Sequence, residues 1–285
     1  MPRRGPWHPA THLALLHAAP GFTVMAIGLA FGLVAGRHHL QPGRLALLAG
    51  LLATNQYAAG ALNDAVDVDR DVEAGRAAEK PIPSGAISRR TVTLLALGSG
   101  AASLGFALAL GPATLALAVV GLACAWSYDL WLKGTAASVL PFAVALPLVP
   151  LFGYGAAGRF PAVLWWAWPI GALAAIAVHL ADSLPDVESD RATGVHGLAP
   201  RLGVGRAVAL AAATYALAGA IALVSGLVAG ERRAALAGTA LAAVLGLAAL
   251  LAGARGGSAR RRVGYRLLLV GMVALALGWV AAVRP

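Results

Sequence analysis

Two short stretches of the chain hold most of its acidic residues. Ten of the twelve Asp and Glu residues lie within residues 64–79 or 182–190. In the first stretch Asn63, Asp67 and Asp71 are spaced four residues apart, which places them on one face of a helix. Carboxylates on successive turns are about 6 Å apart and repel one another. Such a cluster therefore needs cations nearby.

The second stretch repeats the pattern of the first. Asp182, Asp186 and Asp190 again follow one another every four residues, and we expect Pro185 to kink or end the helix that carries them. Residues 67–75 align with residues 186–194 at an offset of 119 residues. This similarity predicts an internal repeat in which the two stretches face each other across a bundle of helices.

The composition of these stretches indicates a particular kind of metal. Oxygen ligands without histidine or thiolate partners favour a hard divalent cation, and Mg²⁺ typically links carboxylates to the phosphate oxygens of a substrate. The candidate metal ligands are Asn63, Asp64, Asp67, Asp71, Asp182, Asp186 and Asp190. The alternative is a pair of solvated acidic loops that only form ion pairs with nearby arginines.

Lysine usage adds a candidate phosphate contact. The chain has twenty arginines but only two lysines, Lys80 and Lys133, and Lys133 follows Tyr128 by five residues. An ammonium group at this position could bind a phosphate oxygen and stabilise a leaving diphosphate. The alternative is a lysine at the membrane interface whose charged end reaches water.

The elements that position these residues are membrane-spanning helices. Of 285 residues, 59% are hydrophobic and 12% charged, and the mean hydropathy of +0.77 excludes a soluble chain. Nine apolar runs are each long enough to cross about 30 Å of hydrocarbon. They cover approximately residues 11–35, 45–66, 91–110, 113–131, 136–153, 162–183, 206–229, 234–253 and 264–283. We therefore expect an all-α integral membrane protein.

Charge distribution predicts the orientation of these spans. With the N-terminus inside, 16 of the 22 basic residues lie on the cytoplasmic side, as do both aspartate motifs. The net charge of +10 then reflects basic loops of a multi-pass protein of the cell membrane, and no nucleic-acid partner is expected. We expect one domain, 1–285, with four-helix pseudo-repeats at about 11–131 and 136–253 and a ninth helix at 264–283.

Three motifs together resemble the UbiA superfamily of intramembrane prenyltransferases. They are Asn63-Asp64-x-x-Asp67-x-x-x-Asp71 followed by Lys80-Pro81-Ile82-Pro83-Ser84-Gly85, then Tyr128-x-x-x-Leu132-Lys133, then Asp182-x-x-x-Asp186-x-x-x-Asp190-Arg191-x-x-Gly194. The resemblance covers roughly residues 10–283. The second motif is most similar to the branch that contains chlorophyll synthase and the archaeal geranylgeranylglyceryl phosphate geranylgeranyltransferase.

The resemblance implies nine transmembrane helices around a central cavity that opens toward the cytoplasm. It also implies Mg²⁺-dependent ionisation of a C10–C20 isoprenyl diphosphate and capture of the allylic cation by a lipophilic acceptor in the membrane. By position, the implied metal residues are Asn63, Asp67, Asp71, Asp186 and Asp190, with Asp64 and Asp182 in support. The implied diphosphate contacts are Asn63, Lys133, Arg70, Lys80 and Arg191, and Tyr128 would lie by the reacting carbon or a phosphate oxygen. The implied catalytic residues are Asp67, Asp71, Asp186, Asp190, Lys133 and Tyr128.

One departure from the family's pattern concerns the acceptor. Gly134 follows Lys133 where members that prenylate hydroxybenzoate place a second base, so an aromatic carboxylic acid acceptor is not expected. Asp129 is either a general base or an ion-pair partner of Lys133, and we favour the ion pair. Two other functions remain open: a terpene cyclase that quenches its own cation, and a secondary transporter with intramembrane acids.

Aromatic residues and one histidine near these motifs also have two interpretations. Trp126 and Trp131 could stabilise a carbocation by cation–π attraction, but an interfacial aromatic belt is the favoured interpretation. His179 lies one turn before Asp182, and we expect a packed or hydrogen-bonded histidine rather than a metal ligand.

Overall fold

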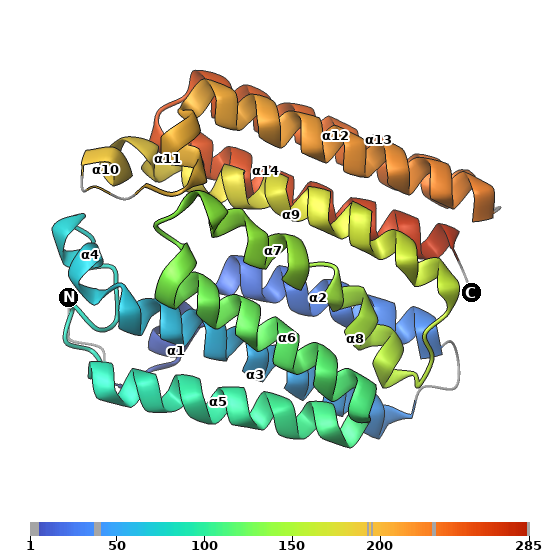
Figure 1. The fold of residues 1–285 in the computed structure, drawn as a ribbon, viewed down its shortest axis with the longest axis horizontal. Helices are drawn as coiled ribbons and strands as arrows, with labels where there is room; N and C mark the ends of the chain where they lie inside the picture. The colour runs from blue at the N-terminus through green and yellow to red at the C-terminus, as the bar shows by residue number, and fades with distance from the viewer. Residues whose placement is uncertain (1–5, 37–40, 193, 195, 230–231, 284–285) are drawn as a thin grey trace.

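The computed structural model describes residues 6–36, 41–192, 194, 196–229 and 232–283. Within these residues, nine helical spans are long and apolar enough to cross a membrane, which confirms a multi-pass, all-helical protein. The long helices run side by side along one axis, and α4, α10 and α11 gather at one end of the bundle (Figure 1). Five charged residues used for the orientation lie outside the described part: Arg3, Arg4, Arg37, Glu231 and Arg284.

Most of the helices are connected by short turns. The first half contains α1 (Pro9–Leu15), α2 (Ala18–Gly36), α3 (Pro42–Val66), α4 (Val68–Glu73), α5 (Arg89–Leu110), α6 (Pro112–Ser127) and η1 (Tyr128–Leu132). The second half contains η2 (Ala136–Val139), α7 (Leu140–Ala145), α8 (Leu148–Ala156), η3 (Ala162–Trp166), α9 (Ala167–Ser183), η4 (Leu184–Asp186), α10 (Val187–Ala192), α11 (Leu198–Leu202), α12 (Val204–Ala229), α13 (Arg232–Arg255) and α14 (Ser258–Ala282).

Local signals at the helix ends explain several of these boundaries. Pro42 and Pro112 lie in the first turns of α3 and α6, where a missing N–H costs nothing. Ser88 caps α5, since its hydroxyl accepts from the N–H of Thr91 at 3.1 Å. Gly111 connects α5 to α6 at a φ of 134°, a conformation that glycine adopts without strain. These signals make α5 and α6 an antiparallel pair.

The first predicted span is interrupted. Residues 11–35 do not form one helix, because α1 ends before Leu16 and His17 has a φ of 50°. The carbonyl of Leu15 packs where a side chain on Gly60 would stand, so α1 lies directly on α3. His17 lies at the turn between α1 and α2, where its Nε2 is 3.0 Å from Oδ1 of Asp64 on α3.

The sixth span continues past its proline. Pro185 lies in the 3-10 turn η4, and the chain then resumes an α-helix, so the residue kinks the span without ending it. Just before the kink, the hydroxyl of Ser183 donates to the carbonyl of His179 at 3.0 Å. The three acids of the second motif are therefore spread over α9, η4 and α10.

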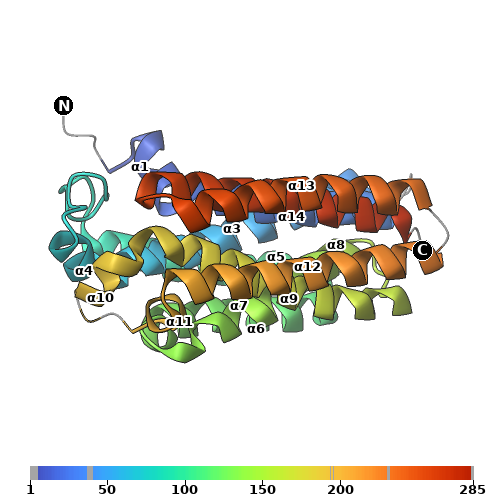
Figure 2. The same ribbon diagram turned by 90° about the horizontal axis from the view of Figure 1, so that it is seen from above.

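The helix ends that carry the two acidic motifs lie at one end of the bundle. The C-terminal ends of α3, α6 and α9 lie at the same end as the start of α14 (Figure 1), and the view from above places α4 and α10 there as well (Figure 2). Small residues allow close contacts elsewhere, as where Gly238 of α13 meets Gly278 of α14. The helices enclose a cavity.

Candidate active site

The first acidic motif lies where α3 ends and α4 begins. Asp67 joins the two helices, Asn63 lies one turn earlier on α3, and Asp71 is on α4. All three side chains line a cavity of about 440 Å³ within the bundle. Asp67 and Asp71 are buried, with relative exposures of 4% and 1%. The helical spacing read from the sequence therefore does place these residues together.

Basic side chains offset the charge of these acids. Lys133 forms an ion pair with Oδ2 of Asp67, and Arg70 donates to Oδ1 of the same carboxylate at 3.2 Å. Arg76 donates to Oδ1 of Asp71 at 2.8 Å. These pairs reduce the repulsion between neighbouring carboxylates that the sequence spacing predicts.

Asp64 has a different position from the other acids of its motif. It is buried but is not among the residues that line the cavity. Its Oδ1 accepts from Nζ of Lys80 at 2.6 Å and lies 3.0 Å from Nε2 of His17. Both of these partners do line the cavity. Asp64 thus holds two cavity residues in place from behind.

The second acidic motif lines the same cavity. Asp182 on α9, Asp186 in η4 and Asp190 on α10 all contribute to its wall. Nη1 of Arg76 lies 3.5 Å from Oδ2 of Asp186 while its Nη2 binds Asp71, so one guanidinium joins the two motifs. The structure brings the two stretches to one site, as their similarity predicts. The four-helix repeat itself stays a prediction.

Two arginines at the start of α14 also contact the second motif. Nη1 of Arg261 donates to both carboxylate oxygens of Glu188 at 2.7 and 2.8 Å. Nη2 of Arg262 lies 4.0 Å from Oδ1 of Asp186. In the sequence, the run Arg260–Arg262 has the appearance of a basic loop that sets membrane orientation. Its contact with the second motif could not be predicted, because no spacing rule connects residues that are more than seventy positions apart.

Arg191, an expected diphosphate contact, lies outside the cavity wall. Its Nε donates to the carbonyl of Pro200 at 2.7 Å, and it is not among the residues that line the cavity. The guanidinium therefore fastens α10 to α11 in this structure.

A π-helical turn positions the residues after α6. In η1 the N–H of Lys133 bonds to the carbonyl of Tyr128 at 2.9 Å, and such turns often occur at functional sites. Asn63 donates to Oδ1 of Asp129 at 2.8 Å, while Lys133 pairs with Asp67. Among the described residues the structure shows no ion pair between Asp129 and Lys133, so the favoured ion pair is wrong: the ammonium of Lys133 pairs with Asp67 instead.

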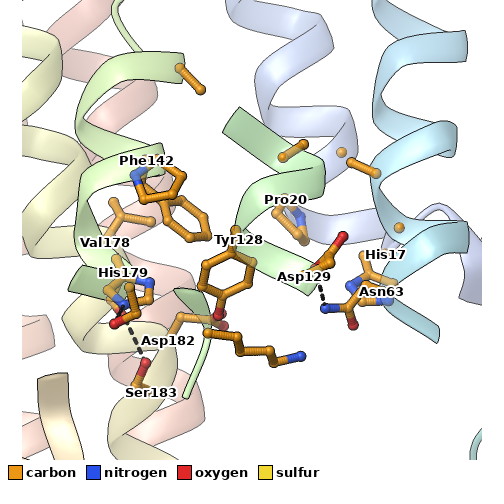
Figure 3. A pocket seen from close by; sticks show the side chains of 18 of the residues that line it. His17, Pro20, Asn63, Tyr128, Asp129, Phe142, Val178, His179, Asp182 and Ser183 are labelled. Carbon is orange, nitrogen blue, oxygen red and sulfur yellow. Dashed lines mark hydrogen bonds between the residues drawn. The ribbon is translucent and has the colours of Figure 1, made fainter. Parts of the chain in front are cut away.

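Aromatic side chains form one wall of the cavity. The ring of Tyr128 meets Phe142 edge-on at a centroid distance of 4.8 Å and His179 at 5.8 Å. Tyr128 lies between these two rings and the pair formed by Asn63 and Asp129 (Figure 3). Nε2 of His179 also lies 3.0 Å from the hydroxyl of Ser138, which confirms a packed, hydrogen-bonded histidine.

Two side chains that line the cavity were not predicted from the sequence. Phe142 lies in an apolar span without any distinguishing signal, and His17 gains its place only through the turn between α1 and α2. The two tryptophans near Tyr128 lie elsewhere: Trp131 is 71% exposed, as an interfacial belt requires, and Trp126 does not line the cavity.

The donor chemistry of the site fits Mg²⁺. Among the described residues, no three His, Cys, Asp or Glu side chains lie close enough together to hold a metal ion by themselves. Mg²⁺ commonly needs only one or two carboxylates, with waters and substrate phosphates supplying its other ligands. Oδ2 of Asp71, a hard ligand atom of a cavity residue, is buried without a hydrogen-bond partner and lies 3.9 Å from Nζ of Lys80.

The fold and cavity together define a multi-pass membrane protein with a carboxylate-rich site inside its helical bundle. The model of the UbiA prenyltransferase family matches residues 23–270. The chain therefore belongs to the UbiA prenyltransferase family, and the expected enzyme class, a prenyltransferase, is confirmed. A secondary transporter has no support from this assignment.

Similar proteins agree with the family assignment. The chain is 33% identical to digeranylgeranylglyceryl phosphate synthase of Methanopyrus kandleri over 199 residues, which are 69% of this chain and 71% of that protein. It is 30% identical to the protein of the same name from Natronomonas pharaonis, over 68% of this chain and 70% of that one.

Solved structures share the fold. A UbiA homolog from Aeropyrum pernix K1 superposes with a TM-score of 0.76 at 22% identity, over 91% of this chain and 97% of that chain. A UbiA homolog from Archaeoglobus fulgidus bound to GPP and Mg²⁺ gives a TM-score of 0.71 at 16% identity, over 95% and 99% of the two chains. The expected nine-helix UbiA-like bundle is confirmed.

Proposed function

We propose that this protein transfers an isoprenyl group from an isoprenyl diphosphate to a lipophilic acceptor within the membrane, with Mg²⁺ as cofactor. One observation carries the proposal: acidic motifs 119 residues apart, together with basic side chains, converge on one end of a single intramembrane cavity. The diphosphate head of an isoprenyl donor needs a charged site, and its isoprenyl tail needs an apolar cavity. The homolog bound to GPP and Mg²⁺ has the same fold, which supports this reading.

The residues proposed to hold Mg²⁺ are those with oxygen atoms at the cavity. They are Asn63, Asp67, Asp71, Asp182, Asp186 and Asp190. When bound, Mg²⁺ would neutralise the diphosphate and make it a better leaving group. We propose that Asp64 acts through Lys80 and His17 and does not bind the metal directly, because it does not line the cavity.

Basic side chains in the site are proposed to bind the diphosphate. Lys133, Arg70, Arg76 and Lys80 line the cavity next to the acids. As the carbon–oxygen bond breaks, negative charge grows on the leaving group, and preorganised cations lower the barrier by stabilising that charge. Lys133 is suited to this role because it follows a π-helical turn that fixes its backbone. Arg191 would need to leave Pro200 to contribute.

Tyr128 and its neighbours are proposed to surround the allylic cation. The Tyr128 ring and the Phe142 ring both line the cavity, and aromatic faces attract cations. The apolar part of the wall is proposed to limit the access of water, which would otherwise quench the cation before the acceptor does. Asp129 is held by Asn63 beside this space and is a candidate to accept the proton that the acceptor releases.

Donor length and orientation stay part of the proposal. We propose C10–C20 isoprenyl diphosphates as donors, with both aspartate motifs on the cytoplasmic side. The relatives named digeranylgeranylglyceryl phosphate synthase suggest that a lipid acceptor is one class to test.

The deciding experiment compares wild type with Asp67→Ala and Asp186→Ala. Purified protein is incubated with Mg²⁺, host lipid extract and geranyl, farnesyl or geranylgeranyl diphosphate, and diphosphate release and product mass are measured together. We expect each variant to lose at least about 100-fold in release rate while remaining folded. Equal release from the wild type and both variants would contradict the proposal.

The aromatic wall supports one alternative, an intramembrane terpene cyclase. Tyr128, Phe142 and His179 could guide a cation toward an intramolecular attack. Product analysis with the diphosphate alone separates the two functions. A cyclase forms a hydrocarbon or terpene alcohol without added acceptor, whereas a transferase requires the lipid extract.

A further inference from the structure

The inner part of the cavity, which the proposed isoprenyl tail enters, also carries polar side chains that the proposed chemistry does not use. Helix α3 lines the cavity with residues three or four positions apart, which form one stripe along its length. The stripe consists of Leu52, Asn55, Gln56, Ala59, Gly60, Asn63 and Asp67. At 1.5 Å per residue, Asn55 lies about 18 Å from Asp67 along the axis. A second pair of polar residues thus lies deep in the bundle, beyond the small residues Ala59 and Gly60.

Charge distinguishes the two ends of the cavity. Among the described residues that line it, the ionisable side chains belong to the end where α3, α6 and α9 terminate and α14 begins. The inner end is walled by apolar side chains, including Val149, Phe152 and Met272. Only neutral polar side chains are present there. They are Asn55, Gln56 and Thr23, and the hydroxyl of Thr23 donates to the carbonyl of Ala19 at 2.9 Å.

The amide of Asn55 is buried without a partner. The residue is 8% exposed, and its Nδ2 has no hydrogen-bond partner among the described residues. A buried donor left unpaired is destabilising, and more so in surroundings that water does not reach. An apolar residue of the same size would fit this wall without that cost, so the amide needs a functional explanation.

We propose that Asn55, with Gln56 beside it, binds a neutral oxygen atom of the acceptor substrate. This inference rests on the proposed prenyl transfer. An NH₂ group donates hydrogen bonds, so its partner is a carbonyl, ether or hydroxyl oxygen. A carboxylate or phosphate is disfavoured, because the described residues that line the inner end include no cation to compensate its charge. The acceptor therefore reaches from the reacting end into the inner cavity and carries a neutral oxygen there.

The test measures binding, so it does not depend on knowing the natural acceptor. The purified protein is saturated with Mg²⁺ and dimethylallyl S-thiolodiphosphate, a slowly ionising donor analogue with a short tail that leaves the inner cavity free. Affinities are then measured by calorimetry for α-tetralone and for tetralin, in which a CH₂ group replaces the carbonyl group. The variants are Asn55→Leu and Asn55→Ala, and Thr54→Val is the matched control.

The control lies on the same helix outside the stripe, where the Thr54 hydroxyl donates to the carbonyl of Gly50. We expect the ratio of the tetralone to the tetralin association constant to fall about tenfold in both Asn55 variants. Tetralin affinity and the Thr54→Val ratio should stay within twofold of wild type. Melting curves identify any variant that fails to fold. If one Asn55 variant fails, the ratio measured for the other Asn55 variant tests the proposal.

The outcomes separate the inference from the function on which it rests. An unchanged ratio in a folded Asn55 variant overturns the oxygen-binding role, as does an equal fall in Thr54→Val. Failure of the donor analogue to bind wild type in a Mg²⁺-dependent manner counts instead against the proposed prenyl transfer.

Discussion

Lys133 and Asp67 are 66 residues apart in the chain, yet their side chains form an ion pair at the charged end of the cavity. The lysine comes from the π-helical turn after α6, and the aspartate joins α3 to α4. A cation that could stabilise a leaving diphosphate is therefore already held beside the acids proposed to bind Mg²⁺. Breaking this relationship should affect turnover directly.

Lys133→Met should reduce diphosphate release. The variant loses the proposed stabilising charge and leaves Asp67 with Arg70 as its remaining ion-pair partner among the described residues. We expect kcat to fall about 100-fold or more, as for the loss of one group that stabilises developing negative charge. Steady-state release assays with farnesyl diphosphate measure it. Lys133→Arg keeps the charge and should recover part of the activity; identical rates for Met and Arg variants would argue against an electrostatic role.

Arg76→Gln should make the protein's stability more dependent on Mg²⁺. Arg76 joins Asp71 to Asp186, so its removal leaves both carboxylates with less positive charge nearby. We expect a lower melting temperature in EDTA, by an amount corresponding to about 1–2 kcal/mol for this half-buried pair. Mg²⁺ should then raise the melting temperature of the variant more than that of wild type. The same Mg²⁺-induced shift in both proteins would count against metal binding between the motifs.

Gly121→Leu should restrict the length of the donor. Gly121 lines the cavity, and a Cβ there would lie 3.8 Å from both Leu148 and Phe152, so the new side chain fits at its base but fills cavity space. We expect kcat/KM for geranylgeranyl diphosphate to fall at least about tenfold, with a smaller change for geranyl diphosphate.

The matched control for this variant is Gly98→Leu. Gly98 is exposed on α5, and nothing lies within 4 Å of a Cβ placed there. It should leave the preference among donors unchanged. A uniform loss for all donors in Gly121→Leu would indicate a general packing defect and not a length limit.

Gly60→Ala should loosen α1 from the bundle. A Cβ at this position would clash with the carbonyl of Leu15, a backbone atom that cannot move without shifting α1. Overpacking of this kind costs about 1–3 kcal/mol, which melting in detergent would detect. Gly105→Ala on α5 has open space around its Cβ and should melt like wild type. Equal melting temperatures for the two variants would show that the α1 contact contributes little.

Much of the fold follows from the sequence because the bilayer imposes strong local rules. Apolar length alone locates the nine spans, with ends within a few residues of the observed helices except in three places: the first span begins at Ala18, α10 extends the sixth span, and the ninth begins at Ser258. The spacing of Asn63, Asp67 and Asp71 likewise places them together, since helical periodicity is a local property. The interruption at His17 was not predictable, because it depends on a contact with Gly60 on another helix.

Some features of the candidate site also follow from the sequence, whereas others depend on the tertiary structure. The types of its acids, the rarity of lysine and the repeated four-residue spacing determine by themselves that a metal–diphosphate chemistry is to be expected. Tertiary structure alone decides that Arg76 joins the two motifs, that Asn63 and not Lys133 holds Asp129, and that Asp64 lies behind the wall. It also decides that Asn55 lines the inner cavity while its Nδ2 has no hydrogen-bond partner among the described residues. The physical reason is that periodicity fixes which residues share a helix face, whereas only the packing of helices distant in sequence fixes what that face meets.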